Sequence, residues 1–260
     1  MHDRSTAILM YGVLLAALGL AGCYQPVDYP QVVSPPEPRI TVIPSYYRIV
    51  GTSVQRHPIL SHVLGHGPDV TFIMATIHGS EAAGTPLVRR LGNYLRANPG
   101  LLEGRTVVLL PVANPDGMAR GSRYNARGVD LNRNFEAANR VVDEHSGPTA
   151  LSEPESQIIR QLIAQYQPDR IVSIHQPLAC IDYDGPAQAL AARMGEYCDL
   201  PVRKLGARPG SLGSYAGVTL GVPIVTFEML SNDSQLDSQT LWNRYGEALV
   251  AAIVYPELMK

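Results

Sequence analysis

The sequence contains little that a nucleic-acid-binding protein requires. Its 260 residues include one tryptophan and three phenylalanines, and 21 Lys and Arg residues against 23 Asp and Glu residues give a net charge of −2. Nucleic-acid binding needs a basic face or a Lys/Arg-rich run, and a single-strand platform needs aromatic side chains on which bases stack. Neither is present, so we expect no nucleic-acid partner.

Two further patterns are missing. No Gly-x-Ser-x-Gly motif follows an apolar run that could form a strand, which argues against a serine hydrolase with a nucleophile elbow. No internal repeat is visible either, and a chain of 260 residues suffices for one well-packed domain with a short appendage. We therefore expect a single globular domain.

Cysteine is scarce, and the position of the first one, Cys23, is informative. It follows an apolar stretch from Ala7 to Leu20, which is shorter than the roughly 20 residues that span a bilayer but is typical of a signal peptide. The sequence Leu-Ala-Gly-Cys at positions 20–23 resembles a bacterial lipoprotein processing site, at which cleavage would leave a lipid on Cys23. The alternative is an ordinary signal peptide followed by a chance cysteine.

From these features we expect a lipoprotein signal peptide (1–22), a lipid-anchored tether (23–44) and one folded domain (45–260). Six prolines in the tether favour extended, semi-rigid backbone. Tyr24 is not the aspartate associated with inner-membrane retention, so for a Gram-negative source we expect export to the outer membrane, facing the periplasm. In that oxidising compartment Cys180 and Cys198 could form a disulfide; two buried free thiols are the alternative.

The domain itself alternates apolar runs with helical patterns, which indicates an α/β fold with a mostly parallel sheet. Ser152 and Glu155 match a capping box at the start of one helix. Strands are predicted at 70–75, 106–110, 170–174 and 222–227, and helices at 84–97, 153–166, 187–198 and within 236–258.

Three candidate metal ligands lie at the ends of predicted strands. His78 and Glu81 come just after the first strand, and His175 ends the third. Ligand sites in α/β folds lie beyond the carboxyl ends of strands, and imidazole nitrogen and carboxylate oxygen are ordinary zinc donors. Three such ligands predict one catalytic Zn²⁺ with a position left for water. The alternatives are a polar turn for the first pair and a core histidine for His175.

Other polar residues could supply the remaining groups of a hydrolytic metal site. Glu228 ends the last predicted strand and suits a general base that takes a proton from a metal-activated water and delivers it to the leaving amine. Asn132 and Arg133 could together hold a substrate carboxylate, and Asp130 could orient a metal-bound imidazole. The alternatives are a solvated glutamate and an arginine-rich surface loop.

These motifs, in the order His78-x-x-Glu81, Asp130 to Phe135, His175 and Thr226-Phe227-Glu228, resemble those of the carboxypeptidase A-like zinc peptidases. The resemblance runs from about residue 46 to the C-terminus. It implies a single three-layer α/β/α domain with a mixed, mostly parallel central sheet. It also implies that Arg123 polarises the scissile carbonyl in the transition state, with Arg127 as a rival for that role and a candidate substrate-binding residue.

The segments 125–130, 180–186 and 209–215 are similar to those of the bacterial murein peptide amidases within that family. This similarity implies hydrolysis of the amide bond between γ-D-glutamate and meso-diaminopimelate in peptidoglycan peptides. The alternatives are a general zinc carboxypeptidase, a zinc N-acyl-amino-acid deacylase and a non-catalytic peptidoglycan-binding lipoprotein.

One departure from the family pattern concerns the tyrosine that closes over the substrate in carboxypeptidases. No tyrosine occurs from Asp199 to Ser214, and Arg208 lies in that neighbourhood instead. We therefore expect Arg208 to contact a second carboxylate of the substrate.

Overall fold

The central element of the fold is a seven-stranded sheet. The computed structural model describes residues 44–257, and its strands lie in the order β1-β2-β4-β3-β5-β7-β6. The four strands β4, β3, β5 and β7 run parallel, whereas β1, β2 and β6 pair antiparallel with their neighbours at the two edges. The strands are β1 Ser45–Thr52, β2 Pro58–Gly65, β3 Asp69–Ala75, β4 Arg105–Leu110, β5 Arg170–His175, β6 Leu178–Asp184 and β7 Ile224–Leu230.

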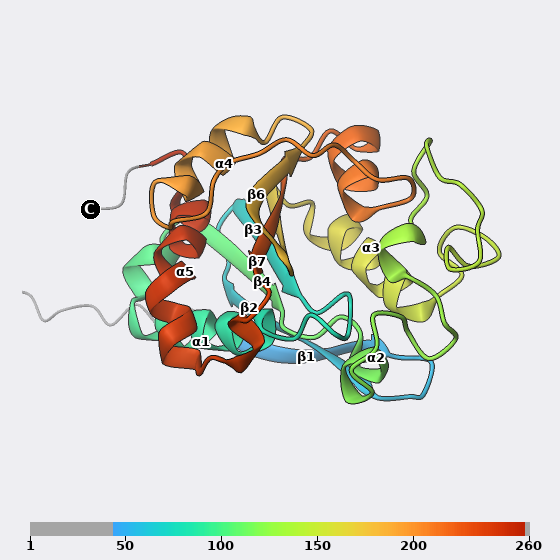
Figure 1. Cartoon of the computed structure of the whole chain (residues 1–260). Coiled ribbons are helices and arrows are strands. Elements are labelled where there is room, and N and C mark those ends of the chain that lie inside the picture. Colours follow the sequence, from blue (N-terminus) through green and yellow to red (C-terminus); the bar gives the residue numbers. More distant parts are fainter. Residues whose placement is uncertain (1–43, 258–260) are drawn as a thin grey trace, which may run out of the picture. The chain divides into compact units, whose positions relative to one another are not determined.

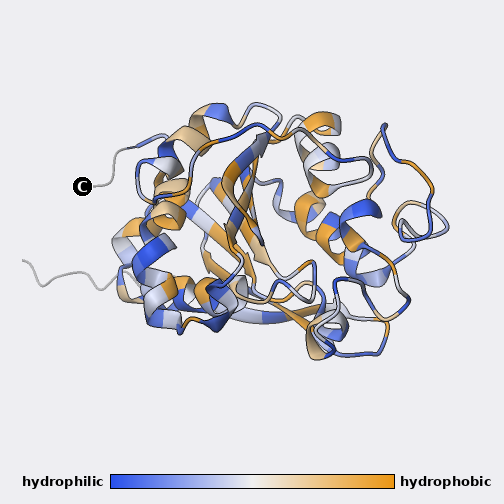
Figure 2. Ribbon diagram, in the orientation of Figure 1, coloured by the Kyte–Doolittle hydropathy of each residue, from blue (hydrophilic) through white to orange (hydrophobic). Residues whose placement is uncertain are grey.

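Helices cover both faces of this sheet (Figure 1). Helices α1 (Gly84–Ala97), α4 (Gln188–Gly195) and α5 (Ser238–Val254) bury apolar side chains against one face. Helix α3 (Pro154–Tyr166) and the π-helix Gly213–Thr219 pack on the other face. The short helix α2 is Pro115–Ala119. Figure 2 shows apolar residues concentrated along the strands and the inner sides of the helices, as expected for central strands buried on both faces.

The predicted α/β fold with a mixed sheet and flanking helices is confirmed, and helix 84–97 has the predicted bounds. The edge strands β1, β2 and β6 were not predicted. The predicted capping box is wrong, because the α3 N-cap is Glu153 and has no side-chain cap hydrogen bond. The Glu155 carboxylate instead accepts hydrogen bonds from Val54 N and Asn125 Nδ2. A long-range partner therefore replaces the local cap.

The predicted disulfide is also wrong, because Cys180 and Cys198 are both free. Side chains alternate between the two faces of a strand, and Ile181 of β6 packs in the cluster formed with α4 and α5. Cys198 packs against that same cluster. Cys180 is next to Ile181 in β6 and must therefore point to the opposite face of the strand. On that face the charges of Glu228 and Asp182 act on its thiol. The sheet separates the two sulfur atoms.

The predicted signal peptide, Cys23 and most of the tether lie outside the described residues. Within residues 44–257, no helix is both long enough and apolar enough to cross a bilayer. The first strand, β1, begins at Ser45.

Candidate active site

The carboxyl ends of the parallel strands bring the predicted residues together. His78 follows β3, His175 is the last residue of β5, and Glu228 lies in β7 directly opposite His175 in the strand register. The long segment after β4 adds Arg123, Asp130 and the 3-10 turn Leu131–Arg133. One cavity is lined by residues from all of these segments. The predicted residues therefore meet around one cavity at the edge of the sheet formed by the carboxyl ends of the parallel strands.

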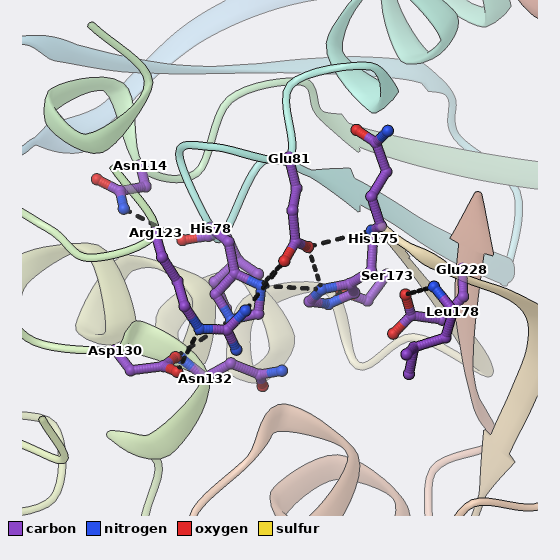
Figure 3. Close-up of polar contacts among 12 residues, drawn as sticks. His78, Glu81, Asn114, Arg123, Asp130, Asn132, Ser173, His175, Leu178 and Glu228 are labelled. Carbon is purple, nitrogen blue, oxygen red and sulfur yellow. Dashed lines mark hydrogen bonds and ion pairs between the residues drawn. The ribbon is translucent and has the colours of Figure 1, made fainter. Parts of the chain in front are cut away.

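His78, Glu81 and His175 form a compact set of metal donors (Figure 3). The Nδ1 atom of His78 lies 2.9 Å from Glu81 Oε1, that of His175 lies 3.0 Å from Glu81 Oε2, and the two Nδ1 atoms are 3.2 Å apart. Tetrahedral zinc with nitrogen and oxygen ligands at about 2.0–2.1 Å would hold its donors roughly 3.3 Å apart. The spacing and the chemistry of these donors therefore fit Zn²⁺.

The far side of each imidazole is also occupied. His78 Nε2 lies 3.2 Å from Asp130 Oδ1, and His175 Nε2 lies 3.0 Å from Ser173 Oγ. When each Nε2 carries the proton, each Nδ1 presents its lone pair to the shared centre, which is how outer partners orient metal-binding histidines. Asp130 thus occupies the position that its predicted orienting role requires.

The two carboxylates of this group stay ionised. Without a metal ion the two Nδ1 atoms can carry protons. Burial then acts to raise the pKa of Glu81, but the hydrogen bonds from His175 and His78 outweigh it and hold the pKa well below its usual value. Burial also acts to raise the pKa of Asp130. The hydrogen bond to His78 and the charge of Arg123 outweigh it and lower that pKa. A negatively charged oxygen is what a zinc ligand must offer.

Arg123 lies against this centre, whereas Arg127 does not. The Arg123 guanidinium donates from Nη1 to Glu81 Oε1 and from Nε to Asp130 Oδ2, both at 3.0 Å. Arg127 does not line the cavity, and its Nη1 lies 3.4 Å from the buried carboxylate of Glu153. The structure therefore places Arg123, and not Arg127, beside the metal donors.

A glycine explains how the Arg123 segment comes so close. A Cβ atom on Gly79 would lie 2.0 Å from the backbone carbon of Gly117, so only glycine allows the loop after β3 to touch the segment after β4. Gly79 N also donates to Arg123 O at 3.4 Å. The middle of the His78-x-x-Glu81 motif is therefore shaped by backbone contact as well as by metal chemistry.

Three groups on the cavity wall can receive an anion. Asn132 Oδ1 accepts a hydrogen bond from Leu212 N at 2.8 Å, which leaves its amide Nδ2 available as a donor. Arg133 is partly buried, and this burial lowers the pKa of its guanidinium, as do the like charges of Arg123 and Arg208. Arg208 lines the same cavity from a more exposed position. The arrangement suits one or two carboxylates.

Glu228 lies on the side of the metal donors opposite to Arg123 and Asp130 (Figure 3). It is 8% exposed, and its Oε2 atom accepts a hydrogen bond from Leu178 N at 3.3 Å. Burial raises the pKa of Glu228 above that of an ordinary glutamate. A raised pKa suits a group that must accept a proton and later return it.

Some cavity residues were not predicted, namely Ser173, Asp182 and Asp184. Ser173 lies within an apolar strand and carries no signal of its own. Asp182 and Asp184 fall in the segment 180–186 that resembles the murein peptide amidases, but no role was assigned to them because β6 was not recognised as a strand. Among the described residues no tyrosine lines the cavity. Tyr215 is buried and stacks on Phe135 with ring centres 5.8 Å apart, so it does not replace the capping tyrosine.

Comparison with known sequences agrees with this geometry. The zinc carboxypeptidase family matches residues 42–196. Murein peptide amidase A of Escherichia coli strain K12 is 38% identical over 180 residues, which cover 62% of this chain and 72% of that protein. Murein peptide amidase A of Vibrio campbellii is 31% identical over 175 residues, covering 60% and 68%.

Solved structures give the same result. The murein-tripeptide amidase of Escherichia coli O157 matches with a TM-score of 0.65 and 29% identity, over 85% of this chain and 96% of that one. Carboxypeptidase A of Helicoverpa armigera matches with a TM-score of 0.68 over 82% and 70%, but at 20% identity this is a likeness of fold alone. The chain belongs to the zinc carboxypeptidase family and is a zinc metallopeptidase with a site for one zinc ion.

Proposed function

We propose that this enzyme hydrolyses peptides derived from peptidoglycan, at the amide bond between γ-D-glutamate and meso-diaminopimelate. The observation that carries the proposal is one cavity in which the metal donors, Glu228 and Arg133 face the same space. The names of the murein peptide amidases at 38% and 31% identity support the choice of substrate.

The carboxylate of the substrate's last residue would bind at Arg133 and Asn132. A guanidinium and a side-chain amide on adjacent residues give three or more donors in a fixed arrangement. Arg133 donates from Nη1 to Asn132 O at 2.6 Å, so its orientation is already set before substrate binds. Holding this carboxylate places the preceding amide bond beside the metal donors.

Zinc, when bound, would polarise the scissile carbonyl and make the attacking water more acidic. Glu228 then accepts the proton of that water, for which its raised pKa is suited. The same carboxyl group delivers the proton to the amine that leaves. Arg123 Nη2 forms no hydrogen bond within residues 44–257, since its bonds use Nε and Nη1, and it can donate to the carbonyl oxygen as negative charge develops there.

The assay for this proposal uses the purified full-length chain in detergent and the peptide L-Ala-γ-D-Glu-meso-diaminopimelate. We expect mass spectrometry to detect free diaminopimelate, with release stopped by a chelator and restored by zinc. No release by a zinc-loaded chain would contradict the substrate and direct the search to ordinary C-terminal amino acids and N-acyl amino acids. No release from a chain that binds no zinc would contradict the peptidase itself.

We further propose that the enzyme is exported and held at the outer membrane through a lipid on Cys23, which would place it beside the cell wall. The support is the apolar stretch and the Leu-Ala-Gly-Cys sequence at positions 20–23. Replacing Cys23 by Ser should release the protein from the membrane fraction. Recovery of Cys23→Ser with the membranes in unchanged amount would contradict a lipid anchor.

A further inference from the structure

Beyond the metal donors, the cavity contains charges that the protein leaves unpaired. Arg133, Arg208 and Asp184 all line it, and none of them forms an ion pair with any residue from 44 to 257. Arg123, in contrast, is paired with Glu81 and Asp130. Asp182 and Glu228 also line the cavity without an ion pair within residues 44–257, but each already accepts a hydrogen bond from a backbone N–H group. Arg133, Arg208 and Asp184 are therefore the two positive charges and the one negative charge left for a substrate.

The unpaired carboxylate of Asp184 is the most unusual of the three, because it is buried. Asp184 is 5% exposed, and within the described part of the chain no group donates a hydrogen bond to it. Its two oxygen atoms are not completely enclosed by protein, but a largely buried carboxylate without a protein partner is unfavourable, and burial together with the charge of Asp182 raises the pKa of Asp184. A cation that entered the cavity would remove this penalty.

Two glycines leave the space that the Asp184 side chain occupies. A Cβ atom on Gly213 would lie 2.3 Å from Asp184 Oδ2, and one on Gly217 would lie 2.7 Å from Asp184 Cβ. Any side chain at these two positions of the π-helix would displace the carboxylate. The glycines thus fix Asp184 against the π-helix, at the border of the cavity that Gly213 also lines.

The strand register sets the distance from Asp184 to the reacting bond. On β6 and β7, Glu228 lies opposite Cys180, and Asp184 lies four residues further along β6, which is about 13 Å at the usual rise per residue. A side chain of four carbons and a terminal amine reaches about 6 Å from its α-carbon, and hydrogen bonds add about 3 Å at each end. The two spans agree to within about 1 Å, so a substrate cleaved beside Glu228 can place a terminal ammonium near Asp184.

We propose that Asp184 binds the ammonium and Arg208 the carboxylate at the far end of the substrate's last residue, while Arg133 holds the carboxylate at its near end. The proposal rests on the proposed function and deepens it. Diaminopimelate has two carboxylates and, once its other amine is acylated, one free ammonium, which complements these three charges. The site thus recognises both the ammonium and the carboxylate at the far end of diaminopimelate, rather than a single charge.

Asp182 supports this arrangement as a positioning residue. Its Oδ1 atom accepts a hydrogen bond from Leu205 N at 2.7 Å, which ties the segment that carries Arg208 to β6. Asp182 and Asp184 are two residues apart and share one face of the strand. One carboxylate holds the segment, and the other is left for the substrate.

Four peptides L-Ala-γ-D-Glu-X test the two contacts separately, without any change to the protein. The residue X is meso-diaminopimelate, lysine (without the far carboxylate), 2-aminopimelate (without the far amine) or norleucine (without both). For the wild type, we expect kcat/KM for lysine to exceed that for norleucine by about 30- to 100-fold, since the ammonium meets a buried carboxylate. The preference for 2-aminopimelate over norleucine should be about threefold to tenfold, because Arg208 is exposed to solvent.

Variants then assign each preference to a residue. Asp184→Asn should reduce the lysine-to-norleucine ratio to near one, and Arg208→Gln should do the same for the 2-aminopimelate-to-norleucine ratio. The matched control is Asp199→Asn, a change at an exposed aspartate after α4, and it should leave both ratios unchanged. Turnover of the norleucine peptide and zinc content report whether each variant is folded.

The proposal is overturned if wild-type enzyme does not distinguish lysine from norleucine, or if Asp184→Asn retains the wild-type ratio. The first measurement stands even if the variant fails to fold. Cleavage of the diaminopimelate peptide together with equal lysine and norleucine rates would refute the role of Asp184 but keep the proposed function. A strong lysine preference with no cleavage of the diaminopimelate peptide would refute the proposed substrate but keep the ammonium site.

Discussion

Glu228→Gln should lower kcat by about 10²–10⁴-fold, the usual contribution of a positioned general base. The glutamine amide has nearly the same size and can still accept the hydrogen bond from Leu178 N, but it cannot take up a proton. Zinc content should stay the same, because Glu228 is not among the metal donors. The comparison requires kcat, KM and bound zinc for both proteins, with Glu247→Gln, at an exposed position on α5, as the matched control.

The pH profile separates this role from a structural one. A general base must be ionised, so wild-type activity should fall as the pH drops through the raised pKa of Glu228. The residual activity of Glu228→Gln should lack that acid limb. A variant with wild-type kcat, or one that keeps the acid limb unchanged, would rule out Glu228 as the base.

The positions of the candidate catalytic and metal-binding residues could be predicted because several of them end an apolar run. A buried parallel strand reads as a continuous apolar segment, and polar residues directly after it must lie at one edge of the sheet. His78, His175 and Glu228 follow this rule. The helix Gly84–Ala97 was predictable for a related reason, since its apolar residues recur at helical spacing and face the sheet.

The choice between Arg123 and Arg127 could not be made from the sequence. The two are four residues apart in one loop, and local spacing does not reveal which of them approaches the metal donors. The close contact between Gly79 and Gly117 decides it. That contact joins loops from two different strands and has no local signal.

Asp182 and Asp184 were missed because β6 follows Gln176-Pro177 and mixes acidic with apolar residues. The amino-acid composition of such a run does not predict a buried strand, because acidic residues are uncommon in strands. It is stabilised by antiparallel pairing with β7 and by the helices packed behind it. The same pairing places Cys180 and Cys198 on opposite sides of the sheet, so the failure to predict the strand also produced the wrong disulfide.

The second prediction with a large expected effect concerns zinc binding by His175. Replacing His175 by Gln should reduce bound zinc from about one per chain to a small fraction, and activity should fall to background, because catalytic zinc needs three protein ligands. Glutamine keeps a polar side chain next to Ser173 and Glu81, so the variant need not leave those buried groups without partners. Zinc content by elemental analysis and hydrolysis of the diaminopimelate peptide are the two readouts.

Thermal unfolding of the same proteins gives a reading that does not depend on turnover. Zinc at 100 times its Kd would stabilise the wild type by about 2.7 kcal/mol, which for a domain of this size raises Tm by roughly 5–10 °C. His175→Gln should lose this shift, while His66→Gln, at an exposed loop position, should keep it. Asp130→Asn leaves all three donors in place and should weaken zinc binding by only about 10- to 100-fold, because it removes an orienting partner rather than a ligand. A zinc-dependent Tm shift of wild-type size in His175→Gln would exclude His175 as a ligand.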